Sequence, residues 1–393
     1  ALLANPLLGD HPILLVRRGG GNLALPANWD SNSSIARTGY DNVLCRLESP
    51  RPDGAVTELY RPSDSRCIKQ VDLHWDATRL LVSMPGTHGR WQVWEMQADG
   101  TGAHELPLIG DEDVDNYDAC YLPDGALLFT STAPFVGVPC VQGSSHVSNL
   151  FRWEPMTGRI RQLCFDQDHN WCPTVLNSGR VLYLRWEYSD IPHFVSRILF
   201  QMNPDGSEQM ATYGSNSYWP NSVFHARPVP DHPTRIVGVV SGHHDTQRMG
   251  ELVLFDPAQG RHEASGVVQR IPGRGKTVEP IIRDALVSSS WPRYLHPWPL
   301  SSTYTLVSCQ PTPTSYWGLY LVDVFDNAVL VHEDPDYALL EPILLVPRPM
   351  PPQVPAKCDP DATLSTVQIA DVYQGPGLAG VPRGTVKALR LVT

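Results

Sequence analysis

The sequence predicts an all-β protein, and three observations support this fold class. A unit of short apolar runs separated by turns rich in Gly, Asp, Asn or Pro recurs along the chain at spacings of about 45 to 65 residues. The 393 residues include 37 Pro and 30 Gly but only 18% charged residues, which is typical of many short strands joined by turns. The first unit lacks one strand, and a segment that could supply it follows the last unit.

The second strand of a unit is expected directly after a turn such as 123–125 or 177–179. The runs in this position are RLLVSM, ALLFTST, RVLYLRW, RIVGVV and YTLVSC. A third strand then leads into a second turn, and the sequences there are versions of one another: WQVWEMQADG, NLFRWEPMTG, RILFQMNPDG, ELVLFDPAQG and GLYLVDVFDN. This order of strands and turns predicts four-stranded blades of a β-propeller.

The two ends of the repeat predict how the ring closes. Residues 12–60 offer only three strands, PILLVRR, NVLCRL and AVTELY, and the segment Leu340–Val346 looks like the missing inner strand. We therefore expect a six-bladed β-propeller over residues 1–350, closed by pairing of the N- and C-terminal strands. Residues 351–393 are expected to be a Pro-rich linker and the start of a further β domain, a short C-terminal β extension that continues beyond Thr393.

Charge and composition exclude several classes of partner. The chain has 30 Lys and Arg against 41 Asp and Glu, a formal charge of −11, which argues against binding to nucleic acid or to a membrane surface. No apolar run is long enough to form a membrane-spanning helix. The eight cysteines form no C-x-x-C pair, so we expect most of them to be buried thiols.

The strand order of a propeller predicts where a site would lie. Inner strands begin on the face where second strands end, because the two are antiparallel neighbours. The starts of the expected inner strands carry Asp118, Asn170, Trp171, Trp219, His296 and Glu341. The candidate ligand-binding residues on this face are Asp118, Trp171, Arg185, Glu187 and Tyr188. The last three could orient a polar ligand or form an ion pair between blades.

A metal site is a second candidate on the same face. The loop Ser241–Asp245 reads SGHHD, and the imidazoles of His243 and His244 are ligand types for zinc, copper or iron. Adjacent side chains of a strand point in opposite directions, so both could reach one ion only if the backbone turns there. The alternative is a hydrogen-bonded pair of loop histidines.

Several catalytic motifs are missing, and no catalytic residue is identified. The sequence has no G-x-S-x-G, no H-E-x-x-H and no C-x-x-C-H. Gly275-Lys276-Thr277 imitates the end of a P-loop, but Arg270 stands where the first glycine is required. A hydrolase would have to use Glu187 and Asp190.

Specific strings give a resemblance beyond the generic repeat. They are ALLANPLL, NYDACYLPDG, GVPCVQGS, RWEYSDIPH, NPDGS, GSNSYWPN, SGHHDTQRMGELVLFDP, WGLYLVDVFDN and GVPRGTVKALR. Over nearly its whole length the chain resembles the propeller region of the hydrazine synthase alpha subunit-like family. In that family the propeller precedes domains with c-type haem, and the assembled enzyme joins nitric oxide with nitrogen at the ammonium level.

The resemblance implies a periplasmic or secreted multidomain protein with a c-type haem in a downstream domain. This chain would then be a scaffold and docking surface for that haem domain or for partner subunits. It would act as an oxidoreductase of nitrogen compounds only together with haem domains outside this chain. The alternative is a non-catalytic module that binds a small polar ligand or a partner protein at its channel face, with a metal ion as the candidate cofactor within the chain.

Overall fold

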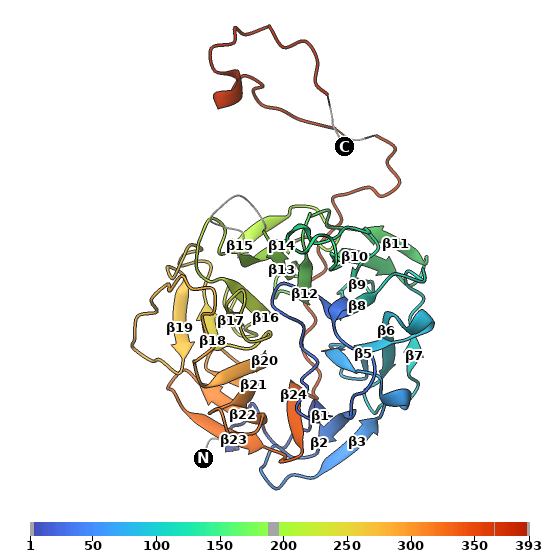
Figure 1. Cartoon of the computed structure of the whole chain (residues 1–393), viewed down its shortest axis with the longest axis vertical. Helices are drawn as coiled ribbons and strands as arrows, with labels where there is room; N and C mark the ends of the chain where they lie inside the picture. The colour runs from blue at the N-terminus through green and yellow to red at the C-terminus, as the bar shows by residue number, and fades with distance from the viewer. Residues whose placement is uncertain (1–3, 188–195, 365, 391–393) are drawn as a thin grey trace. The chain divides into compact units, whose positions relative to one another are not determined.

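The computed structural model describes residues 4–187, 196–364 and 366–390. In these residues the chain forms β-strands, loops and short 3-10 turns. Four sheets have four antiparallel strands each, in the orders β24-β1-β2-β3, β4-β5-β6-β7, β11-β10-β9-β8 and β20-β21-β22-β23. A fifth sheet has eight strands, β12 to β19, but its two halves are joined only by one parallel pair, Arg197 with Ser222. The sheets are arranged around a common centre (Figure 1).

The strands have the following bounds. The first three groups are β24 (Tyr337–Leu344), β1 (Ile13–Gly19), β2 (Asn42–Leu47) and β3 (Val56–Tyr60); β4 (Lys69–Leu73), β5 (Arg79–Pro85), β6 (Trp91–Gln97) and β7 (His104–Glu105); and β8 (Asn116–Tyr121), β9 (Leu127–Ser131), β10 (Asn149–Glu154) and β11 (Arg159–Gln162). The others are β12 (Asn170–Val175), β13 (Val181–Trp186), β14 (Arg197–Met202) and β15 (Met210–Tyr213); β16 (Ser222–Pro228), β17 (Ile236–Ser241), β18 (Glu251–Phe255) and β19 (Val267–Ile271); and β20 (Arg293–Pro299), β21 (Tyr304–Gln310), β22 (Gly318–Asp323) and β23 (Ala328–His332).

The predicted strands of the repeat are confirmed. The five expected second strands are β5, β9, β13, β17 and β21, and the expected third strands are β6, β10, β14, β18 and β22. The predicted partnership of the two ends is also present, because β24 pairs antiparallel with β1, with Ile13 opposite Leu344 and Val16 opposite Leu340. The last strand of the repeat therefore completes the sheet that the first strand begins.

The apolar core lies between neighbouring sheets. One cluster joins Leu15 of β1 and Leu340 of β24 to Val71 of β4 and Leu295 of β20, so it spans three adjacent sheets. Similar clusters fill the spaces between the other pairs. Alternate residues of each strand face the sheet on either side, so burial of both faces explains why the strands are apolar almost throughout.

Cysteine behaves as the sequence predicts over most of the chain. Cys45, Cys67, Cys120, Cys164 and Cys309 are buried thiols that form no disulfide, and Cys172 is a partly buried one. Burial raises the pKa of the Cys164 thiol to about 12. These thiols are therefore protonated, small apolar side chains at neutral pH.

The chain divides into a larger part, Ala1–Ala356, and a smaller part, Lys357–Thr393. In the smaller part, residues 357–364 and 366–390 contain one 3-10 turn, Pro376–Leu378, and no strand. The described residues of the expected C-terminal β extension form no strand. A strand needs a neighbour to bond its backbone groups, and residues 357–364 and 366–390 supply none. Its assignment to a further β domain stays a prediction.

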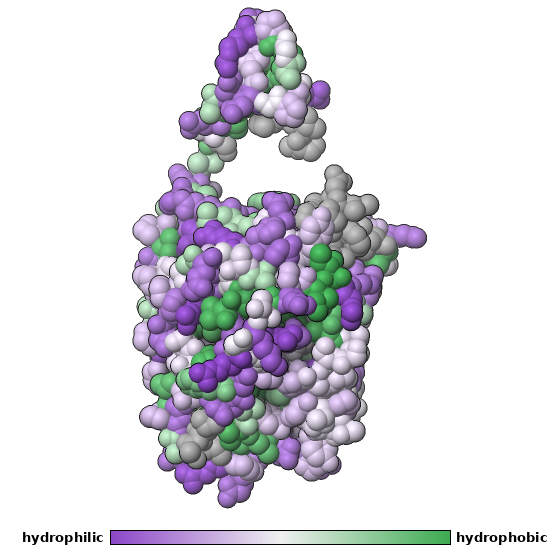
Figure 2. Space-filling view, turned by 90° about the vertical axis from the view of Figure 1, so that its left-hand side faces the viewer, coloured by the Kyte–Doolittle hydropathy of each residue, from purple (hydrophilic) through white to green (hydrophobic). Residues whose placement is uncertain are grey.

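The surface of the larger part is mixed in character. On the side shown in Figure 2, hydrophilic side chains are interspersed with apolar ones. No helix in the described residues is long and apolar enough to cross a membrane.

Candidate functional site: a polar cavity at the centre of the sheets

Six strands share one backbone irregularity near the centre of the molecule. In each of β4, β8, β12, β16, β20 and β24 the pairing with the neighbouring strand shifts at a β-bulge. One residue in each bulge has a φ between +49° and +57°, a conformation that L-residues other than glycine rarely adopt. We call these six the hub residues: Gln70, Asp118, Cys172, His225, His296 and Glu341.

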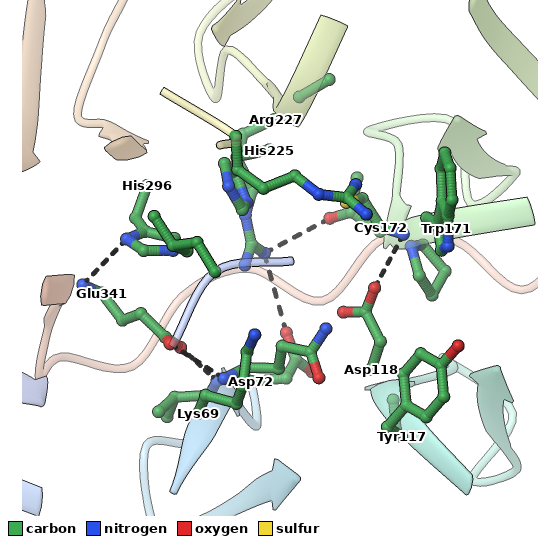
Figure 3. Close-up of a pocket in the computed structure, with 18 of the residues that line it drawn as sticks. Lys69, Asp72, Tyr117, Asp118, Trp171, Cys172, His225, Arg227, His296 and Glu341 are labelled. Carbon is green, nitrogen blue, oxygen red and sulfur yellow. Dashed lines mark hydrogen bonds and ion pairs between the residues drawn. The ribbon is translucent and has the colours of Figure 1, made fainter. Parts of the chain in front are cut away.

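All six hub residues line one cavity of about 90 Å³. The residue after each hub residue is small or a proline, namely Val71, Ala119, Pro173, Ala226, Pro297 and Pro342. Proline is tolerated within a strand mainly at bulges and edges, so these positions agree with the irregular backbone. Figure 3 shows the acidic, imidazole and thiol side chains around this space.

Hub side chains bond the backbone of the neighbouring sheet. The Glu341 carboxylate accepts hydrogen bonds from the backbone N–H groups of Gln70 and Val71, at 2.9 and 2.7 Å. The Asp118 carboxylate accepts one from Cys172 N–H at 2.8 Å. His296 Nδ1 lies 3.4 Å from the backbone nitrogen of Glu341, which donates to it. These bonds tie adjacent sheets together at the centre and hold the hub side chains in place.

A loop between β1 and β2 covers one end of the cavity. We call residues 22–35 the strap; Leu25, Pro26, Ser31 and Asn32 of this segment line the cavity. Lys69 Nζ donates to Ala24 O at 2.7 Å and to Asn32 Oδ1 at 3.1 Å. The segment has no periodic pattern of apolar residues, so its place over the cavity was not predicted.

The strap is also fastened to the loop that follows β17. Asn28 Nδ2 donates to Ser241 Oγ, Gly242 O and Thr246 O at 3.0, 2.8 and 3.1 Å, and Asn28 Oδ1 accepts from Arg248 N–H at 2.6 Å. These bonds join the loop after β17 to the strap, and Arg248 of this loop lines the cavity.

Charged groups of both signs surround the cavity. The cationic side chains are Lys69, Arg227 and Arg248, and the acidic ones are Asp72, Asp118 and Glu341. Burial lowers the pKa of Lys69 to about 8 and raises that of Asp118 to about 6. The Arg248 guanidinium carbon lies 4.5 Å from the ring centre of Trp171 and 4.4 Å from that of Phe224, which favours its position by cation–π attraction.

The two hub imidazoles form a pair. The ring centres of His225 and His296 are 4.4 Å apart. Burial, together with the nearby cationic side chains, lowers both pKa values well below the usual value of 6.5. Both imidazoles are therefore neutral at physiological pH and can donate or accept a hydrogen bond.

The predicted ligand-binding residues divide into two groups. Asp118 and Trp171 line the cavity, together with His296 and Glu341 from the same sequence argument. Arg185 and Glu187 are not among the lining residues. Arg185 forms an ion pair with Asp166 at 2.9 Å and lies over the Phe200 ring. An ion pair was the alternative to ligand binding that its sequence position allowed.

Glu187, Tyr188 and Asp190 follow β13 in the sequence. Backbone N–H of Glu187 donates to Ser196 O at 3.0 Å. Tyr188 and Asp190 lie outside the described residues, so their predicted roles stay predictions.

The two candidate metal ligands have different surroundings. His243 is 5% exposed, and burial beside Arg197 lowers its pKa to about 3. The exposed His244 places Nδ1 2.9 Å from a carboxylate oxygen of Asp284. Among the described residues, no three His, Cys, Asp or Glu side chains are grouped to hold a metal ion. His244 is thus a hydrogen-bonded loop histidine, as the alternative to a metal ligand proposed. A metal site at His243 and His244 stays a prediction.

Sequence reasoning did not single out several cavity residues, above all Gln70, Cys172 and His225. For three hub residues the sequence contains a signal that could have identified them. Each is a polar residue followed by proline inside an apolar strand: Cys172-Pro173, His296-Pro297 and Glu341-Pro342. Such a proline indicates a bulge, and a bulge redirects the preceding side chain.

We expect Asp118→Asn to change the pH dependence of stability. The pKa of Asp118 is raised from 3.8 to about 6 in the folded protein, so its contribution to stability is greatest below pH 3.8 and declines as the pH rises to about 6. Asparagine removes this decline. After discounting for partial exposure of the side chain, the variant should gain about 1–2 kcal/mol relative to wild type between pH 4 and 7.

Urea unfolding at pH 4 and pH 7 measures this change. Asp113→Asn, on an exposed loop, is the matched control and should follow the wild-type profile. Parallel wild-type and Asp118→Asn profiles would show that Asp118 ionises at its ordinary pH in the folded state.

Repeated four-stranded antiparallel sheets around a polar centre define a protein of the β-propeller type. No family model and no curated protein matches the chain. Among solved structures it is similar to hydrazine synthase from Kuenenia stuttgartiensis, with a TM-score of 0.63 and 15% identity over 87% of this chain and 48% of that one. TolB from Acinetobacter baumannii has a TM-score of 0.49 and 10% identity over 85% of this chain and 67% of that one. This chain thus spans about half the length of the hydrazine synthase chain, and the likeness shows the propeller fold alone.

Proposed function

We propose that the chain is a closed, six-bladed β-propeller that binds a small polar ligand in its central cavity. The observation that carries the proposal is the convergence of six hub residues from six strands on one space. Residues in such strained backbone conformations each cost about 1–2 kcal/mol, and they cluster at binding sites because the surrounding structure holds them for function. The closure rests on the pairing of β24 with β1.

The size and lining of the cavity fit a ligand of a few heavy atoms. Apolar atoms of Pro26, Val71 and Trp298 line parts of the wall, and the hub residues supply polar groups. A mostly preformed cavity with a few converging polar groups is the usual form of a small-molecule site. Glu341 and Asp118 are already bonded to backbone N–H groups, so binding would need little rearrangement.

A second candidate function rests on the resemblance to the hydrazine synthase alpha subunit-like family. In this reading the propeller is a scaffold on which a downstream c-type haem domain or partner subunits dock, in a periplasmic or secreted protein. The observation that favours it is the likeness to a hydrazine synthase chain about twice as long as this one. Sequencing the gene beyond Thr393 tests it, because a C-x-x-C-H motif there supports the scaffold and its absence opposes it.

Three isosteric probes test ligand binding without presuming the charge of the ligand. Formate, formamide and formamidinium have nearly the same size and carry a negative, no and a positive charge. We expect at least one to raise the melting temperature of wild type, because a probe at 100 times its Kd adds about 2.7 kcal/mol of stability. Calorimetric titration of the same probe should give a matching Kd.

A cavity-filling variant locates the binding. Ala119 lines the cavity, so Ala119→Leu should abolish the probe-induced shift, whereas Ala258→Leu, in an exposed turn, should preserve it. The proposal fails if no probe binds wild type, or if Ala119→Leu binds the probe as well as wild type does.

A further inference from the structure

The acidic side chains of the cavity are engaged by the protein itself. Both carboxylate oxygens of Glu341 accept backbone hydrogen bonds, and one oxygen each of Asp118 and Asp72 does so, the latter from Tyr121 N–H at 3.1 Å. Hydrogen bonds from backbone N–H groups spread and stabilise the negative charge of a carboxylate. These acids therefore have a structural role that accounts for their presence.

The cationic side chains differ in how firmly they are bound. Lys69 has short hydrogen bonds to the strap, and Arg248 donates to the backbone oxygen of Asp30. Arg227 has only long polar contacts: its Nη1 lies 3.4 Å from Thr174 Oγ1 and 3.7 Å from a carboxylate oxygen of Asp72. Its guanidinium carbon is 5.3 Å from the ring centre of Trp298. Most of the five N–H donors of this guanidinium thus remain available to a ligand.

A neutral imidazole with an unused nitrogen lies in the same wall. Nε2 of His225 is buried and has no hydrogen-bond partner in the described residues. A buried polar atom without a partner is unfavourable, so a ligand that bonds to it removes that penalty. His225 precedes Arg227 by two residues on β16, and both side chains line the cavity (Figure 3).

The electrostatic field favours negative charge at this place. Burial lowers the pKa of His225 most, and the nearby positive charges of Arg248, Lys69 and Arg227 lower it further. A cation bound beside His225 would meet the same repulsion. An anion would be attracted, and a planar one could accept two parallel hydrogen bonds from a guanidinium.

We propose that the cavity binds a small planar oxyanion with one negative charge, such as a carboxylate, against the guanidinium of Arg227 and Nε2–H of His225. This inference rests on the proposed function and specifies its ligand class. Thr174, whose hydroxyl oxygen lies beside Arg227, is positioned to donate a third hydrogen bond. The hydrogen on His225 is then on Nε2, the tautomer in which this nitrogen donates.

The order of probe affinities on wild type tests the inference without any variant. Formate should bind at least tenfold more tightly than formamide, and formamidinium should not bind, with sodium chloride at equal ionic strength as the reference. Nitrate, a planar inorganic oxyanion, distinguishes a site for any such anion from one that requires a carboxylate. Tightest binding by formamide or formamidinium would overturn the inference and leave the proposed function standing, whereas no binding by any probe would overturn both.

A pair of arginine variants tests the position of the anion. Arg227→Gln should weaken formate binding at least tenfold and change formamide binding less than threefold. Arg46→Gln, outside the cavity, is the control and should bind formate as wild type does. Unchanged formate affinity in a folded Arg227→Gln protein would contradict the assignment of Arg227. If this variant does not fold, His225→Phe provides the same comparison, because it removes Nε2 and leaves the Arg227–Asp72 contact in place.

Discussion

A chain that ends at Asp336 is expected not to fold, whereas a chain that ends at Ala356 is expected to unfold cooperatively like the full protein. The shorter chain lacks β24, which supplies the inner edge of the sheet that contains β1. Four of its apolar side chains, Leu339, Leu340, Ile343 and Leu344, are 0–5% exposed. Burial of each contributes about 1.5–3 kcal/mol, so their sum approaches the entire stability of an ordinary domain.

Loss of β24 also exposes its neighbours. Leu14 and Val16 of β1 would face solvent, and β1 would present an unpaired edge that favours aggregation. Near-UV circular dichroism and urea unfolding of the two truncated chains measure the difference. A cooperative transition of the shorter chain at the wild-type midpoint would show that pairing of the ends is dispensable. The longer chain controls for removal of residues 357–393, which form a separate part.

Glu341→Ala is expected to destabilise the protein by about 3 kcal/mol, more than any other single hub substitution. The Glu341 carboxylate is the acceptor for two backbone N–H groups of β4, at 2.9 and 2.7 Å. Alanine leaves both donors without this acceptor, and each buried donor that loses its partner costs about 1–3 kcal/mol. The bonds join the sheet of β24 to the sheet of β4, so their loss also loosens the contact between the two.

Glu341→Gln and a surface control refine this expectation. Glutamine has one acceptor oxygen, so it can satisfy only part of the pair, and we expect it to cost about half as much as alanine. Glu333→Ala, on the exposed side of the same region, should stay within about 0.5 kcal/mol of wild type. The free energy of unfolding in urea is the measurement. Equal effects of Glu341→Ala and Glu333→Ala would show that the hub bonds contribute nothing to stability.

Much of the fold could be predicted from the sequence because the repeat is regular where strands and turns alternate. The turn residues and apolar runs located the second and third strands, and the incomplete first unit predicted the partner of β1. The C-terminal runs of residues 363–393 were apolar too, but an apolar run forms a strand only beside a partner. The local pattern could not show that the described residues of that part contain no partner strand.

The candidate site was predicted in part. Strand order singled out Asp118 and Trp171, which line the cavity, because antiparallel neighbours fix which strand ends meet. It could not show that Arg185 turns to Asp166, since the direction of a long side chain depends on packing. The strap was missed for a different reason: residues 22–35 have no periodicity and are held by side-chain hydrogen bonds such as those of Asn28.

The shared backbone of the hub residues has a consequence for how such a site can change over time. The same bulge carries a carboxylate at two positions, an imidazole at two, and an amide and a thiol at the others, with φ confined to +49° to +57°. Side-chain chemistry at the centre is therefore separable from the strand pairing that forms the sheets. Single substitutions at six equivalent points could recombine acids, bases and soft donors on one frame, which makes this centre a natural starting point for laboratory evolution of new binding specificities.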